Sequence, residues 1–167
     1  MFLTGYHGTT LLNAEKIIES NKFNISHKNI EWLGNGIYFY SNISDACDWK
    51  NSEAILHSII KVKDDEYLDI DSENGAKIFN EVFKTISQKQ KKKVSTKFID
   101  IQKNQYAVMK TIWSVCDNIK VISASFPTKD RTFLTLIDRQ PLRKEFCVKD
   151  NDCIKHTYLI KRGDFDD

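Results

Sequence analysis

The sequence predicts a single α+β domain in which two β-sheets pack together with helices at their edges. The chain has 167 residues, 41% of them hydrophobic, which is enough for one domain with a buried core. It contains 2 prolines and 6 glycines, too few for a linker-rich or low-complexity protein. The order of the expected elements is a loop, a helix and a strand, then helices, and then a run of strands. This order is typical of an α+β domain.

The N-terminal region is expected to contain a small loop at His7, a helix and a strand. Apolar residues at helical spacing predict the helix over residues 11–20, and either Thr9 or Thr10 can cap its N-terminus through a hydroxyl group. The aromatic and alternating stretch at residues 36–40 predicts the strand.

The rest of the chain is expected to add helices first and strands last. A turn after residue 40 leads to a second short helix, which Ser44 caps and which runs through Trp49. The other expected elements are strands over residues 54–62 and 66–70, helices over 74–91 and 105–116, and strands near 120–126, 131–137, 145–149 and 158–161.

Basic residues are concentrated in the second half of the chain, whereas Asp and Glu are frequent in the first. The net charge of +2 does not by itself indicate a nucleic-acid-binding protein. Aromatic residues are interleaved with the basic ones, as platforms for stacked bases would require. The set comprises residues 89–93, Lys97, Lys103, Lys129, Arg131, Arg139, Arg143 and Lys144, with Phe98, Tyr106, Phe126 and Phe133. The cluster at 89–93 has a second interpretation, a solvated helix end, because cations are favoured at a helix C-terminus.

The four cysteines lack the spacing of a metal site. Cys47, Cys116, Cys147 and Cys153 form no C-x-x-C pair, so we expect small buried thiols in a reducing cytosol and no metal. No apolar run approaches the ~20 residues of a membrane helix, and the N-terminus does not resemble a signal peptide. The expected location is therefore the cytoplasm, with no membrane partner.

Two short motifs carry the strongest functional signal. Residues 6–9 are Tyr-His-Gly-Thr, and residues 34–39 are Gly-Asn-Gly-Ile-Tyr-Phe. A glycine lets the backbone approach a planar ligand, and an imidazole can bond a ribose hydroxyl at neutral pH. Each residue also has an ordinary interpretation, a structural histidine or a core aromatic. Phe39 is expected in the core, because it points to the opposite side of the strand from Tyr38.

In this order and spacing the motifs resemble the ADP-ribosyltransferase fold, specifically its His-Tyr-Glu branch, which includes the poly(ADP-ribose) polymerases and diphtheria-like toxins. The resemblance implies that residues 1–167 form one catalytic domain, a split β-sandwich of two sheets, and that NAD is its substrate. It implies that His7 bonds the adenosine-side ribose, that Gly8 presents backbone groups to the nicotinamide amide, and that Tyr38 and Trp49 stack on the nicotinamide ring. The residues implied for NAD binding are His7, Gly8, Thr9, Tyr38, Ser44 and Trp49.

The third element implied by the resemblance is an acid at the start of a late strand. Glu145 matches this position best, with Asp138 and Asp150 as alternatives. Nicotinamide departs through an oxocarbenium-like transition state, so a carboxylate beside the ribose can hold its 2-hydroxyl and stabilise the cation. It can also polarise the incoming nucleophile. The implied catalytic set is His7, Tyr38 and Glu145.

The function implied is that of a mono-ADP-ribosyltransferase, a glycosyltransferase of the bacterial or phage toxin or defence type. The basic and aromatic residues of the second half slightly favour nucleic acid, RNA or DNA, over protein as the acceptor. Because such an enzyme would be harmful when free, a neutralising antitoxin protein is a plausible partner.

Three other functions remain open. The same site can hydrolyse NAD with water as the acceptor. An RNA 2′-phosphotransferase shares the fold and a His-Gly-Thr loop, but it would need basic residues for the RNA phosphate, and the first arginine of this chain is Arg131. A non-catalytic module for binding NAD or ADP-ribose would keep the pocket without using Glu145.

Overall fold

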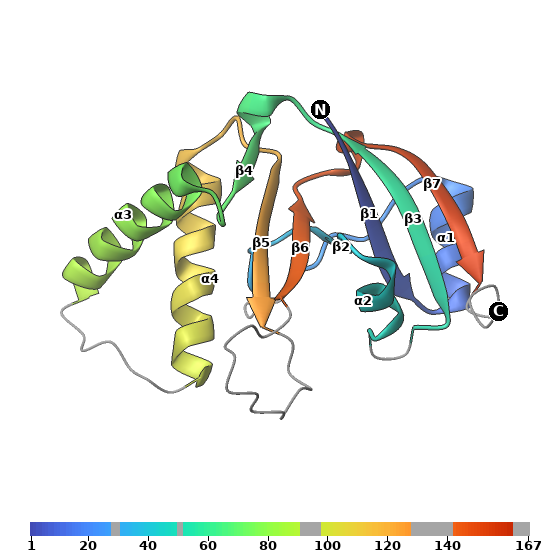
Figure 1. The fold of residues 1–167 in the computed structure, drawn as a ribbon, viewed down its shortest axis with the longest axis horizontal. Helices are drawn as coiled ribbons and strands as arrows, with labels where there is room; N and C mark the ends of the chain where they lie inside the picture. The colour runs from blue at the N-terminus through green and yellow to red at the C-terminus, as the bar shows by residue number, and fades with distance from the viewer. Residues whose placement is uncertain (28–30, 50–51, 91–97, 128–141, 162–167) are drawn as a thin grey trace.

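The computed structural model describes residues 1–27, 31–49, 52–90, 98–127 and 142–161, and within these ranges it is an α+β arrangement (Figure 1). The strands are β1 (Phe2–Thr9), β2 (Ile37–Tyr40), β3 (Ala54–Lys61), β4 (Tyr67–Asp69), β5 (Val121–Pro127), β6 (Leu142–Val148) and β7 (Ile154–Lys161). The α-helices are α1 (Leu11–Ser20), α2 (Ile43–Cys47), α3 (Glu73–Gln90) and α4 (Phe98–Val115). None of the described helices is both long enough and apolar enough to cross a membrane.

The seven strands form one mixed sheet with the order β4-β5-β6-β2-β1-β3-β7. Strands β4 and β5 run parallel, and the other neighbouring strands are antiparallel. The expectation of two separate packed sheets was wrong, because β1 and β2 join the two halves of the sheet through the pair Tyr6 and Tyr40. The sheet is therefore continuous but narrow at its centre.

Helices cover both faces of this sheet. On one face, α1 packs through Ala14 and Ile17 into the core that contains Phe39, which is fully buried. On the other face, α4 packs through Met109 and its neighbours into a second core, against which Tyr38 lies. Because successive side chains of a strand point to opposite faces, Phe39 and Tyr38 belong to different cores, as the sequence predicted.

The N-terminal segment differs from the prediction. His7 lies in strand β1, not in a loop, and this strand pairs with β3 along its whole length. Gly5 and Gly8 weaken the strand signal of this segment, since glycine has little intrinsic preference for a strand. The long-range pairing with β3 determines its conformation.

Several predicted boundaries also change. Helix α1 has the predicted bounds, and Thr10 is its cap, with its hydroxyl 3.3 Å from the amide of Asn13. Asn42, not Ser44, caps α2, which ends at Cys47 before Trp49. Helix α4 begins earlier than residue 105, and β7 begins at Ile154 rather than 158. The strand expected at 131–137 lies outside the described residues.

Candidate functional site

A cavity of about 380 Å³ opens beside the point where β1 and β2 separate. Its walls come from the ends of β1 and β2, the beginning of α1, strand β6 and the segment between α1 and β2. The lining residues are His7, Gly8, Thr9, Thr10, Asn13, Asn24, Ser26, Glu31, Trp32, Gly36, Tyr38, Tyr40, Trp49 and Glu145. Six of the residues predicted from the sequence, His7, Gly8, Thr9, Tyr38, Trp49 and Glu145, therefore meet in one place.

His7 connects the two halves of the sheet at this cavity. Its Nδ1 atom lies 2.7 Å from the carbonyl oxygen of Tyr38, and since a carbonyl can only accept, Nδ1 carries the proton. Its ring also contacts Phe23 and Phe39 edge-on. Burial lowers the pKa of His7 below the ordinary 6.5, while the bond to Tyr38 opposes this shift. At neutral pH the imidazole is therefore uncharged, and Nε2 is a hydrogen-bond acceptor.

Tyr38, Tyr40 and Glu145 share the face of the sheet that forms the cavity floor. Tyr40 on β2 pairs directly with Glu145 on β6, and Tyr38 lies two residues away along the same strand. The hydroxyl of Tyr38 donates to the carbonyl of Gly34 at 2.7 Å and accepts from the amide of Leu33 at 3.0 Å. These bonds fix the ring, so that it presents a rigid aromatic surface to the cavity.

The carboxyl group of Glu145 has a raised pKa. Burial raises its pKa to about 7, opposed by Arg143 and reinforced by Glu31 and Asp45. Among the described residues, none donates a hydrogen bond to this carboxyl group. Near pH 7 this group is therefore partly ionised, and its oxygens are available to a ligand.

Arg143 fixes α2 against β6 beside the cavity. Its Nε atom lies 3.1 Å from a carboxylate oxygen of Asp45, and its Nη2 atom 3.6 Å from one of Asp48. The guanidinium group also lies 5.2 Å from the centre of the Tyr40 ring, at a distance typical of a cation–π contact. Arg143 is thus held by protein carboxylates, next to Glu145 on the same face of β6.

Packing alone requires glycine at position 8. A Cβ atom at this position would collide with the carbonyl oxygen of Ala46 and would lie 2.9 Å from the hydroxyl of Ser52. Strand β1 can therefore lie against the C-terminal end of α2 only with glycine here. The Cβ atom of Trp49 also lies within 3.1 Å of that position, and both Thr9 and Trp49 line the cavity.

Trp49 lies at the rim, two residues beyond the end of α2. Its side chain is 51% exposed, and its ring is tilted by 48° against Tyr40, with 6.3 Å between the ring centres. Ser44, which the sequence placed with it in the binding set, lies inside α2, and its amide donates to the cap Asn42. Ser44 does not belong to the cavity lining in the part of the chain that the structure describes.

Glu31 is a second carboxylate in the cavity, and sequence reasoning missed it. It lies in the segment between α1 and β2, where no periodic pattern marks a functional residue. Its carboxylate accepts a hydrogen bond from the hydroxyl of Ser26 at 2.7 Å. Tyr40 was also missed, although its position two residues from Tyr38 on a strand was a usable signal.

The remaining sequence candidates lie elsewhere. Asp150 caps the short 3₁₀ helix Asn151–Cys153 by accepting from the amide of Asp152 at 2.9 Å, and it does not line the cavity. Asp138 lies outside the described residues.

Two of the proposed nucleic-acid contacts are already in ion pairs. Arg143 is bound to Asp45 and Asp48, and Lys144 lies 2.7 Å from Asp69. The other basic residues of that set, 89–93, Lys97, Lys103, Lys129, Arg131 and Arg139, have side chains outside the described part of the structure.

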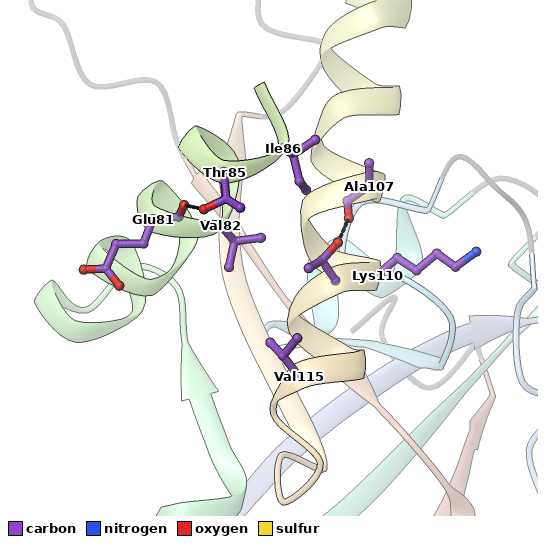
Figure 2. Close-up of a pocket in the computed structure, with 8 residues that line it drawn as sticks. Glu81, Val82, Thr85, Ile86, Ala107, Lys110 and Val115 are labelled. Atoms are coloured by element: carbon purple, nitrogen blue, oxygen red, sulfur yellow. Dashed lines mark hydrogen bonds between the residues drawn. The ribbon is translucent and has the colours of Figure 1, made fainter. Parts of the chain in front are cut away.

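A larger groove of about 650 Å³ lies between α3 and α4 (Figure 2). Its sides are mostly aliphatic, with Val82, Ile86 and Val115 among them. The carboxylate of Glu81 points away from α4. The groove lacks a histidine or an aromatic ring among its described lining residues, so it offers no set of groups comparable to that of the smaller cavity.

The described cysteines are all free thiols. Cys147 is fully buried on β6 beside Tyr38, and burial raises the pKa of its thiol well above the ordinary value. In the ranges that the structure covers, no three His, Cys, Asp or Glu side chains gather as metal ligands would.

Comparison with known proteins gives one partial relative and no family. No protein-family model matches the chain. An uncharacterized protein of Methanocaldococcus jannaschii, MJ0359, is 39% identical over 66 residues, which cover 36% of this chain and 31% of the other. The similarity thus spans about a third of each protein.

Proposed function

We propose that this protein is an NAD-dependent mono-ADP-ribosyltransferase. One observation carries the proposal: His7, Tyr38 and Glu145 come from three different strands, and they line a single cavity of about 380 Å³. These residues are distant in the sequence, and they supply the groups that cleavage of the bond between nicotinamide and ribose requires. The ADP-ribosyltransferase variant of the α+β class is part of this proposal.

In the proposed complex, His7 and the two aromatic walls bind the NAD substrate. The unprotonated Nε2 atom of His7 accepts a hydrogen bond from a ribose hydroxyl, because Nδ1 is held by Tyr38. The nicotinamide ring lies between the cavity surfaces of Tyr38 and Trp49, where a positively charged ring gains about 0.5 to 2 kcal/mol from an aromatic face. Gly8 and Thr9 contribute the backbone edge of this pocket.

Glu145 carries the chemical step. The bond between the ribose carbon and the nicotinamide nitrogen breaks, nicotinamide leaves with the bonding electrons, and positive charge develops on the ribose. The carboxylate of Glu145 stabilises that charge and accepts the proton of the attacking acceptor group. The pyridinium of bound NAD also favours the ionised carboxylate, since an opposite charge nearby lowers the pKa of an acid.

The cavity composition does not favour the RNA 2′-phosphotransferase alternative. No Lys or Arg lines the cavity among the described residues, whereas Glu31 and Glu145 both do. Two carboxylates would repel an RNA phosphate, but they suit a substrate whose reacting end is cationic. A role as a toxin or anti-phage effector, with one ADP-ribose added per event and an antitoxin as partner, belongs to the same proposal.

The test uses NAD labelled in its adenylate portion, purified protein and cell lysate. We expect the wild type to release nicotinamide and to attach label to macromolecules. Glu15→Gln, an exposed control on α1, should do the same. Glu145→Gln should do neither. Separate protease, RNase and DNase digestions identify the acceptor class. Nicotinamide release without bound label would replace the transferase with NAD hydrolysis, and no release would refute the enzyme assignment.

A further inference from the structure

A second cavity of about 280 Å³ lies beside the first cavity, which His7, Tyr38 and Glu145 line and which is the proposed NAD cavity. A two-stranded wall separates the two. The wall is the antiparallel bridge between Ser26 and Gly36, each of which donates its amide to the other's carbonyl, at 2.9 and 3.2 Å. Ser26 and Gly36 line the first cavity, whereas their neighbours Ile25 and Asn35 line the second. Side chains of extended backbone alternate in direction, so one short segment forms a boundary of both cavities.

Leu33 and Gly34, which lead into this wall, are held by side chains that line the two cavities. Tyr38, which lines the first cavity, bonds both residues through its hydroxyl group. The Nε1 atom of Trp113, which lines the second cavity, donates to the carbonyl of Leu33 at 2.7 Å. A group in the second cavity therefore lies next to the segment that positions Tyr38.

The second cavity combines positive charge with aromatic surface. Lys110 and Lys149 line it, and the ammonium of Lys149 lies 5.9 Å from the centre of the Trp113 ring. Lys110 leaves α4 on the side away from α3, as Figure 2 shows. Tyr106 adds a second ring, and no carboxylate lines this cavity among the described residues.

We propose that this second cavity binds a nucleotide of a single-stranded nucleic acid and so presents the acceptor strand to the NAD cavity. Its base lies against Trp113 and Tyr106, and its phosphate lies between Lys110 and Lys149. Single-strand-binding grooves use this pairing of ring faces with cations, and every base can stack in them. The charge distinguishes the two cavities: carboxylates line the first, and lysines line the second. The inference rests on the proposed transferase and assigns its acceptor.

Binding of an oligonucleotide tests the inference without relying on catalysis. The probes are fluorescein-labelled single-stranded RNA and DNA of about 12 nucleotides, within the range that such grooves cover. The variant is Lys110→Ala/Lys149→Ala, and its matched control is Lys16→Ala/Lys77→Ala, two exposed lysines on α1 and α3. Anisotropy titrations at several salt concentrations give the affinity and its salt dependence, and a separate titration gives the affinity for NAD.

We expect the Lys110/Lys149 variant to bind the oligonucleotide about tenfold more weakly, with a salt slope smaller by about 0.7, as the loss of one neutralised phosphate requires. The control variant and the NAD affinity should be unchanged. Equal oligonucleotide binding by both variants, or no binding by the wild type, would overturn the inference and leave the transferase proposal standing. Weaker NAD binding by the Lys110/Lys149 variant would instead assign the cavity to the adenylate half of NAD.

Discussion

His7 bonds the backbone of Tyr38, with 2.7 Å between Nδ1 and the carbonyl oxygen, beside the one register pair that joins β1 to β2. The residue implied by the resemblance to bind ribose therefore has a structural contact as well. The two ring nitrogens separate these roles, because Nδ1 is used by the protein and Nε2 is available to a ligand.

Two substitutions at His7 should separate stability from activity. The amide nitrogen of Asn can replace Nδ1, so His7→Asn should keep most of the stability and lower NAD turnover roughly tenfold to hundredfold. His7→Ala should lose about 1 to 2 kcal/mol of unfolding free energy as well, because the Tyr38 carbonyl loses its partner. Urea denaturation and nicotinamide release measure the two effects. Full activity in His7→Asn would refute the ligand role of Nε2.

The pH dependence of catalysis should follow the ionisation of Glu145. The pKa of about 7 predicts that kcat/KM rises as the pH increases through 7, because the reactive form is the carboxylate. Arg143→Gln removes the nearby positive charge that lowers this pKa, so the midpoint should move upward by about one unit. Lys144→Gln is the control, since this neighbour pairs with Asp69 and points to the other face of β6. A midpoint that stays constant in Arg143→Gln would contradict the assignment.

Glu145→Gln should make the protein more stable at alkaline pH while it abolishes activity. The pKa of Glu145 is raised from 4.5 to about 7 on folding, so the group is protonated in both states below pH 4.5. As the pH rises from 4.5 to 7, the unfolded chain ionises this group while the folded protein still holds the proton, so the stability relative to the Gln variant falls, and it levels off above pH 7. The difference should grow from below about 0.5 kcal/mol at pH 4.5 to roughly 3 kcal/mol at pH 8. Urea unfolding at both pH values measures it, with Glu15→Gln as the exposed control; an equal difference at both pH values would argue against a buried acid.

Trp49→Ala should affect NAD binding more than folding. The side chain is 51% exposed, so its loss should cost less than about 1 kcal/mol of stability. If it forms one wall for the nicotinamide, the dissociation constant for NAD should rise roughly twofold to thirtyfold. Tyr158→Ala is the control, because that ring is 55% exposed on β7 and does not line the cavity. Calorimetric titration compares them, and equal affinities would exclude Trp49 from the site.

Local patterns predicted the helices and part of the site. The bounds of α1 follow from its apolar spacing and from Thr10, whose capping bond depends on neighbouring residues alone. The opposite directions of Phe39 and Tyr38 follow from strand geometry. His7, Tyr38, Trp49 and Glu145 were selected by resemblance, and their common cavity emerges only once the strands are paired.

What the sequence could not predict depends on partners distant in the chain. Strand β1 was read as a loop because its strand conformation comes from pairing with β3. The continuity of the sheet depends on the pairing of Tyr6 with Tyr40, which no local sequence pattern predicts. Glu31 enters the site because the Ser26–Gly36 bridge folds its segment against β2. Hydrophobic periodicity cannot predict this bridge either.

The narrow centre of the sheet gives the candidate site a mechanical property. Among the described strands, β1 and β2 share one register pair, whereas β1 and β3 share eight. Residues on both sides of this junction line the cavity, so a ligand there connects the two halves of the sheet. Part of its binding energy would then resist their separation, and the amide protons of β1 and β2 would exchange more slowly with solvent in the complex than in the free protein.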